Sequence, residues 1–147
     1  TGNPVFVSTG ISGMDEIVKA AQGAEKDIGF IHTQLSVELE DVNLSAIASM
    51  REKTGCPVSF GLHCDDFDVL SLSLAFKPEA IFFYIKDNND LEYPDDSYAV
   101  NLKNISGLIK KLNQLSKTIG DGEKHTFKPK TLADDEKPQV LNESDPE

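Results

Sequence analysis

The sequence predicts an α/β fold built from four consecutive parallel β/α units, which is half of an eight-stranded (β/α) barrel. Two observations lead to this prediction. Short apolar runs start at residues 5, 28, 58 and 81, and each is followed by a loop and a stretch with helical periodicity. The runs are too short and too uniformly apolar for half-exposed antiparallel strands, whereas buried parallel strands have this pattern. In such barrels the functional residues lie on the loops after the strands.

The composition limits the classes of partner and compartment. The chain has 147 residues, a length typical of one domain, and a formal net charge of −11, which argues against a nucleic-acid partner. No run of about 18 apolar residues is present, so no membrane span is predicted. Cys56 and Cys64 flank a predicted buried strand, and we expect both to be reduced in a cytoplasmic protein. The chain opens on a strand without an initiator Met, so we expect its natural start to lie elsewhere.

The first predicted strand leads into an amphipathic helix. Ser12 and Asp15 stand at the spacing of a capping box and predict where this helix begins, and Gly23 predicts where it ends. The apolar positions of the helix are Met14, Ile17, Val18 and Ala21.

The second unit follows the same order. Its strand ends near His32, residues 37–42 form a loop, and the helix after the loop ends at Gly55. The apolar side of this helix consists of Leu44, Ile47, Ala48 and Met50.

The last two units differ in their loops. A loop over 61–66 precedes a helix over about 67–76 that is apolar on most sides, so we expect it to be well covered, and Pro78 stops it. The fourth strand leads into a long polar loop over 86–98. The final helix, over about 102–119, has Ile105, Leu108, Ile109, Leu112 and Leu115 at helical spacing.

The domain is therefore predicted to span residues 1–120. Residues 121–147 contain three prolines and many charges without apolar periodicity, which is typical of a disordered polar tail or a linker.

Three small residues stand at the mouth of the first strand. Ser8 and Thr9 carry hydroxyls, and Gly10 would let the backbone approach an anion or a sugar hydroxyl closely. The alternative is a simple turn before a helix.

Two histidines and several carboxylates follow the later strands. His63 lies just past a strand beside Asp65 and Asp66, and an imidazole with carboxylates suits a divalent metal; the alternative is a histidine hydrogen-bonded at the rim. His32 ends a strand and could face the same mouth. Asp95, in the long loop, could bind metal or orient a substrate, or be simply solvated.

These motifs, in this order, resemble the sialic acid synthase family, whose members condense phosphoenolpyruvate (PEP) with N-acetylmannosamine or a related amino sugar on a TIM barrel. Residues 4–12, PVFVSTGIS, are close to the family's PVILSTGMS, and residues 40–44 match its EDVNL. Residues 57–63 fall on PVGYSDH, and residues 93–96 fall on GPDH. The resemblance implies that the chain is strands five to eight of the barrel, followed by the linker toward a small antifreeze-like domain.

The departures from the family pattern lie in the implied active site. The resemblance implies two metal-binding histidines; His63 keeps the first, and Tyr84 stands at the second. A phenol is a much poorer ligand for Mn²⁺ or Mg²⁺ than imidazole near neutral pH. The family's Ser-Asp before the first of these histidines becomes Gly61-Leu62, and the loop after His32 lacks the family's Asn and Tyr. The retained binding candidates are Ser8, Thr9, Gly10, His63 and Asp95, with His32 as a further candidate.

The favoured function is consequently a diverged synthase-like barrel fragment without the PEP-condensing activity, a pseudoenzyme that binds a ligand or acts as a scaffold and needs no cofactor. One alternative is a PEP-condensing enzyme that uses Mn²⁺ or Mg²⁺ in an altered site around His63 with Asp65, Asp66 or Asp95. Another is a structural half-barrel that pairs with a separate chain. The expected partner is the missing N-terminal half of the barrel, on the same or another chain, and the resemblance implies a possible homodimer.

Overall fold

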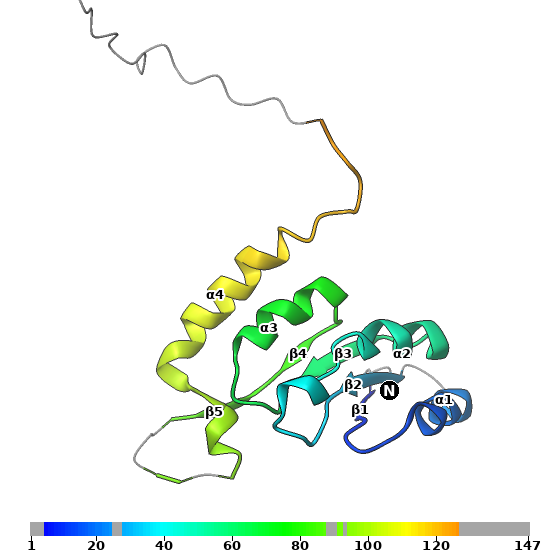
Figure 1. The fold of residues 1–147 in the computed structure, drawn as a ribbon, viewed down its shortest axis with the longest axis horizontal. Coiled ribbons are helices and arrows are strands. Elements are labelled where there is room, and N and C mark those ends of the chain that lie inside the picture. The colour runs from blue at the N-terminus through cyan, green and yellow to red at the C-terminus, as the bar shows by residue number, and fades with distance from the viewer. Residues whose placement is uncertain (1–4, 25–27, 88–90, 93, 127–147) are drawn as a thin grey trace, which may run out of the picture.

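The computed structural model describes residues 5–24, 28–87, 91–92 and 94–126, and its centre is a parallel sheet (Figure 1). Strands β1 (Val5–Ser8), β2 (Ile28–His32), β3 (Val58–Gly61) and β4 (Ile81–Phe82) lie side by side in sequential order. All three neighbouring pairs are parallel. The predicted α/β class and the predicted strand order are therefore confirmed.

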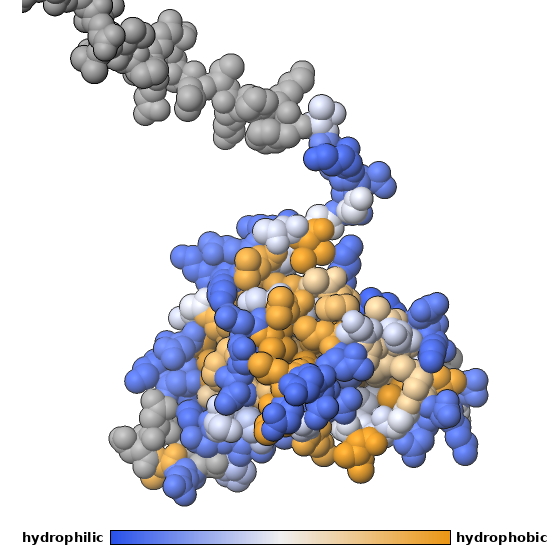
Figure 2. All heavy atoms as spheres, in the orientation of Figure 1, coloured by the Kyte–Doolittle hydropathy of each residue, from blue (hydrophilic) through white to orange (hydrophobic). Residues whose placement is uncertain are grey.

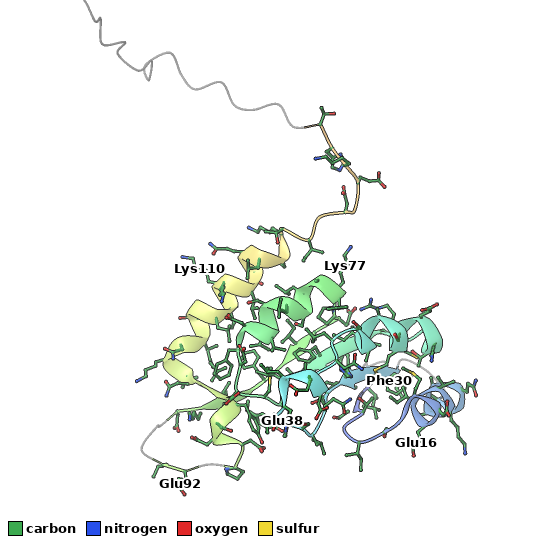
Figure 3. The ribbon with its side chains drawn as sticks, in the orientation of Figure 1. Glu16, Phe30, Glu38, Lys77, Glu92 and Lys110 are labelled. Atoms are coloured by element: carbon green, nitrogen blue, oxygen red, sulfur yellow. The ribbon has the colours of Figure 1, made fainter. Side chains whose placement is uncertain are left out.

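Four helices follow the strands and build the core against one face of the sheet. They are α1 (Met14–Gly23), α2 (Ala46–Thr54), α3 (Asp68–Ser73) and α4 (Ile105–Ser116). The largest fully buried side chains come from β2 and β3 and from the helices that cover them: Phe30, Phe60, Ile47, Met50 and Leu70. Figure 3 shows Phe30 inside the layered part of the molecule, whereas the charged side chains of Glu16, Lys77 and Lys110 lie at its periphery.

The edge strand β1 is poorly covered. Every residue of β1 is exposed, and the exposed fraction is 57% for Val5 and 38% for Val7. Parallel sheets are normally covered on both faces, so this part of the molecule has the exposure of an unfinished barrel. Figure 2 shows another apolar region, in the middle of the visible face, with hydrophilic residues around it.

The fourth predicted strand is divided. Residues 81–84 were expected to form one strand, but β4 ends at Phe82, and a separate strand, β5 (Tyr84–Lys86), follows Phe83. β5 pairs in parallel with β6 (Ala99–Asn101), which lies just beyond the predicted 86–98 loop, and the two form a second small sheet. The polar loop is thus closed by a strand that the sequence did not predict.

The helix ends partly follow the prediction. α1 begins after Gly13, whose backbone N–H donates to a Glu16 carboxylate oxygen at 2.9 Å, so the predicted start at Ser12 and Asp15 is wrong. α2 ends at Gly55 in the left-handed conformation, as predicted. α3 is shorter than the predicted 67–76 helix, and Leu72 is 62% exposed, so the helix is less covered than expected.

Short 3₁₀ turns join several elements. They are η1 (Leu39–Asp41), η2 (Leu74–Phe76), η3 (Asp96–Tyr98) and η4 (Leu102–Asn104). Most of the predicted tail lies outside the described residues. Of the helices in the described ranges, none has the length and apolar character needed to cross a membrane.

Candidate functional site

A pocket of about 320 Å³ lies where the parallel strands end. Ser8 ends β1, Thr33 follows β2, and Gly61 ends β3 two residues before His63. The lining residues described are Ser8, Ile31, Thr33, Leu35, Gly61, Leu62, His63, Phe82, Phe83 and Tyr84. The structure thus brings Ser8, His63 and Tyr84 together, while Lys86 lines a neighbouring hollow beyond Tyr84.

Two glycines leave space for bulky side chains on the face of the sheet opposite the helices. A Cβ atom on Gly29 would lie 3.0 Å from the ring of Phe6, so the missing side chain leaves space for that ring. Phe6 in turn meets Phe82 edge-on, with ring centroids 5.9 Å apart. A Cβ atom on Gly61 would lie 3.1 Å from Ile31. Apolar and aromatic side chains therefore pack on this face of the sheet next to the pocket.

His63 is held among aromatic rings. The ring of Tyr98 lies 4.5 Å from the imidazole, centroid to centroid, at an interplanar angle of 37°. Tyr84 meets His63 edge-on at 6.3 Å, and the two phenols are 5.9 Å apart. The Nδ1 atom of His63 is buried and has no hydrogen-bond partner among the described residues. His63 thus lines the pocket while its Nδ1 atom is enclosed.

Asp95 reaches this cluster through Tyr98. The Tyr98 hydroxyl donates to Oδ1 of Asp95 at 2.6 Å, and this bond raises the pKa of Tyr98 to about 12. Asp95 adopts a left-handed conformation, with φ of 62°, immediately before η3. Sequence reasoning singled out Asp95 but missed Tyr98, because a lone tyrosine after a polar loop carries no periodic signal. Its position three residues after Asp95 was the only clue.

Two of the predicted site residues hold the backbone together. The Thr9 hydroxyl and the Thr9 backbone N–H both contact the carbonyl oxygen of Ile31, at 3.0 and 3.1 Å. His32 is 3% exposed, and its Nε2 lies 2.9 Å from the carbonyl oxygen of Val42 on the core side of the sheet. Neither residue is among those that line the pocket, and Gly10, with φ of 35°, makes the turn after β1.

The carboxylates near His63 in the sequence interact with other groups or line a different hollow. Asp66 accepts the backbone N–H of Asp68 at 2.9 Å near the start of α3, and Asp96 forms a 2.7 Å ion pair with Lys86. Asp65 lines a separate acidic hollow with Glu38. Within the described ranges, no group of three or more His, Cys, Asp or Glu side chains could hold a metal ion.

The donor set around His63 consequently does not fit a divalent metal. Its ring neighbours are two phenols, which are poor ligands for a hard divalent ion, and the bond to Asp95 raises the pKa of Tyr98 to about 12 from an ordinary value near 10. Burial raises the pKa of the adjacent Cys64 thiol, which disfavours its thiolate form.

Comparison with known proteins identifies relatives of this chain. A sequence profile described as the NeuB family matches residues 1–124. An uncharacterised protein of Methanocaldococcus jannaschii is 28% identical over 130 residues, which are 84% of this chain and 39% of that protein. A pseudaminic acid synthase of Campylobacter jejuni is 24% identical over 125 residues, which are 81% of this chain and 36% of the synthase. The chain thus spans less than two fifths of these curated relatives.

A solved structure has the same fold. The N-acetylneuraminic acid (sialic acid) synthetase from Leptospira borgpetersenii, crystallised with citrate, superposes with a TM-score of 0.77 and 22% sequence identity. The superposition covers 86% of this chain and 46% of the synthetase, so the chain corresponds to about half of that structure.

Proposed function

Because the chain belongs to the NeuB family, we propose that it is a diverged half of a NeuB-type barrel that lacks PEP-condensing activity and acts as a binding or scaffold module. The relatives and the solved neighbour include synthases of pseudaminic and N-acetylneuraminic acid, which motivates testing for such an activity. The proposal is that this chain keeps the scaffold of those enzymes without their chemistry.

The observation that carries the proposal is the pairing of His63 with Tyr84. By resemblance, these are the positions of two metal-binding histidines, and their rings lie 6.3 Å apart. An imidazole beside a neutral phenol is a weak donor set for Mn²⁺ or Mg²⁺. A bound metal of this kind would polarise the substrate carbonyl, so its loss removes a contribution of several kcal/mol.

A second line of support is the apolar pocket. Leu62, Phe82 and Phe83 stand where the resemblance implies an aspartate, a glutamate and a lysine, and all three line the pocket. Apolar side chains cannot stabilise the charge that develops on a phosphorylated substrate.

The deciding experiment is a condensation assay with the native protein, PEP, N-acetylmannosamine and Mn²⁺, scored against a metal-free control. We expect no metal-dependent product, because losing the metal alone costs on the order of a thousandfold in rate. Clear metal-dependent turnover would overturn the proposal and favour the alternative of an enzyme with an altered metal site.

The exposure of β1 favours a second candidate function, a structural half-barrel completed by another half. Val5, Phe6 and Val7 form an apolar strand at the edge of the sheet with no covering element among the described residues. Such an edge is a template for pairing. The partner would be the missing N-terminal half, on the same or a separate chain, and homodimers are a further possibility to test by size measurement in solution.

A further inference from the structure

We propose that the outer surface of the helix pair α3 and α4 docks the acidic segment 134–143 of the same chain. The surface offers apolar side chains with lysines around them, and the segment offers an apolar pair with carboxylates around it. Residues 134–143 lie outside the described residues, and their contribution rests on their sequence. The inference goes beyond the proposed binding or scaffold function and does not depend on it.

The docking surface, here named the α3–α4 patch, is centred on Leu72, Ala75 and Leu115. Lys111 of α4 donates to Oδ1 of Asp68 of α3 at 3.0 Å, which fixes how the two helices lie side by side. The helices run in the same direction (Figure 1), so Leu72 and Leu115, each four residues further on, lie one turn beyond this bridge. Leu72 is 62% exposed, Ala75 is exposed and Leu115 is half-buried. Figure 2 shows apolar surface over this helix pair.

The patch does not depend on the other half of a barrel. Its two walls are consecutive helices of this chain, and another half would join at the outer strands of this one. It would meet α4 on the side away from α3. Leu72 lies on the side of α3 that carries Asp68, away from the buried Leu70. The exposure of the patch is therefore a property of the outer helix layer.

Lysines surround the patch. Residues 102–120 contain four lysines and no acidic residue, although the chain has a formal net charge of −11. Lys110 and Lys117 are exposed, and neither forms an ion pair within the described part of the chain. Figure 3 shows Lys110 on α4 and Lys77 at the far end of the α3 segment, so cations flank the patch. The matching partner is an apolar group between carboxylates.

The sequence after α4 has this chemistry. Residues 131–147 contain six acidic residues and one lysine, so the most acidic stretch of the chain follows its most basic helix. The acidic run 134–136 precedes the apolar pair Val140 and Leu141, and Glu143 follows the pair. An extended segment can place the apolar pair on the patch and its carboxylates near the lysines without forming a helix or a strand.

The chain leaves α4 close to the patch. The pKa of the Asp121 carboxyl is lowered by hydrogen bonds with the backbone N–H of Glu123 and with His125, and also by the charge of Lys77. Asp121 is thus near Lys77, which stands two residues after Ala75 of the patch. The chain therefore turns toward the α3 side after α4 ends.

The connecting residues are long enough for the segment to fold back. α4 has 12 residues and is about 18 Å long at about 1.5 Å per residue. Residues 127–133 can span up to about 24 Å when extended. A short tether also keeps the segment at an effective concentration on the order of millimolar, so weak contacts are sufficient for docking.

The first test is carbodiimide crosslinking of the native protein, which joins a lysine amine to a carboxylate where the two groups are in contact. Mass spectrometry should find crosslinks from Lys110 or Lys117 to the acidic run 134–136 within one chain. Lys19, an exposed residue of α1, is the control and should give at least about tenfold fewer crosslinks to that run.

Three results of this test would overturn the proposal. They are equal yields from Lys19, the absence of crosslinks to the run 134–136, and crosslinks that form only between two copies of the chain. A mixture of ¹⁴N- and ¹⁵N-labelled protein separates the last case, because its crosslinked pairs carry both labels.

The second test needs no variant. The amide NMR signals of Val140 and Leu141 are compared between the native protein and a free peptide of residues 127–147. Docking should separate the two sets of shifts, and salt at about 0.5 M should move the native signals toward the peptide positions because it screens the attraction between lysines and carboxylates. Coincident shifts at low salt would contradict docking.

A matched pair of variants locates the contact. Leu72→Glu places a negative charge in the patch, and Leu39→Glu places one at another exposed leucine, in η1; the exposed fractions are 62% and 51%. Only Leu72→Glu should lower the crosslink yield, by at least about threefold, and move the Val140 and Leu141 signals toward the peptide positions. Equal effects of the two variants, or no effect of Leu72→Glu, would show that the segment does not dock on the patch.

Discussion

Tyr84 lies beside His63 at the pocket. Its ring packs edge-on against the imidazole and is itself partly exposed at the pocket. Replacing this phenol by imidazole would place a second imidazole beside His63, at the start of β5. The other side chains that line the pocket would still be hydroxyl-bearing or apolar.

We therefore predict that Tyr84→His raises the affinity for Mn²⁺ at least about tenfold without restoring turnover, because the phosphate and sugar contacts remain absent. Manganese binding can be followed by electron paramagnetic resonance. Tyr84→Phe is the control and should bind Mn²⁺ no better than the wild type. Recovery of PEP condensation in Tyr84→His would show that the other replaced residues matter little.

A second prediction at the residue scale concerns Tyr98. The bond to Asp95 raises its pKa to about 12, whereas tyrosines in the unfolded chain titrate near pH 10. The folded protein thus holds this proton more tightly, so the stabilisation is present below about pH 10 and is lost as the pH rises through about 12. Phenolate absorbance should lose its highest-pH step in Tyr98→Phe, and in Asp95→Asn this step should move toward lower pH.

The sequence could predict only part of the site. Ser8 and His63 follow buried strands, and parallel strands place their ends together, so their meeting in one pocket was predictable. The aromatic neighbour Tyr98 was not, because its contact with His63 depends on how the 86–98 segment folds back. His32 was ambiguous for a different reason: side chains alternate along a strand, and a single residue of register decides between core and pocket.

At the scale of the elements, the ends of helices depend on residues that can adopt unusual backbone angles. Gly55 closes α2 with φ of 67°, and its backbone N–H donates to the carbonyl oxygen of Arg51 at 2.9 Å. Gly107 lies inside α4, where no such angle is needed. Added Cβ atoms would meet nothing within 4 Å at either position, so the two glycines differ in conformation and not in packing.

This pair allows a matched stability prediction. Gly55→Ala should lower the free energy of unfolding by about 1 kcal/mol, because a left-handed alanine is strained. Gly107→Ala should raise it by up to about 1 kcal/mol, because alanine is the better residue in a helix interior. Urea unfolding of the two variants measures both changes. A change of the same sign in the free energy of unfolding of both variants would contradict the conformational explanation.

The sequence predicted the long apolar elements better than the short ones. The first three strands carry enough β-branched and aromatic residues to be recognised, and Gly55 marks the end of α2. β6 was missed because Ala99–Asn101 is only three residues long and is stabilised by pairing with β5, a contact between distant segments. The start of α1 was misplaced because Glu16 competes with Asp15 for the capping role and binds Gly13.

At the scale of the whole molecule, the chain spans only part of the proteins that it resembles. It corresponds to 46% of a solved synthetase of the same fold and to less than two fifths of its curated relatives. Its four-stranded sheet ends in β1, where every residue is exposed. A helix layer covers one face of the sheet (Figure 1). The rings of Phe6 and Phe82 meet edge-on, 5.9 Å apart between centroids.

The last prediction therefore concerns the native protein, in which β1 should be covered by the other half of the barrel. Val7 is 38% exposed and Ile109 is 46% exposed, so the isolated structure predicts similar small effects for a charge at either position. If β1 is an interface, Val7→Lys places a charge in an apolar contact and also loses the burial of a valine, which is worth about 1.5–3 kcal/mol. Thermal denaturation should then show a clearly lower Tm for Val7→Lys than for Ile109→Lys. Equal Tm values for the two variants would mean that β1 stays uncovered. The half-barrel would then be stable with an unpaired edge strand in its parallel sheet.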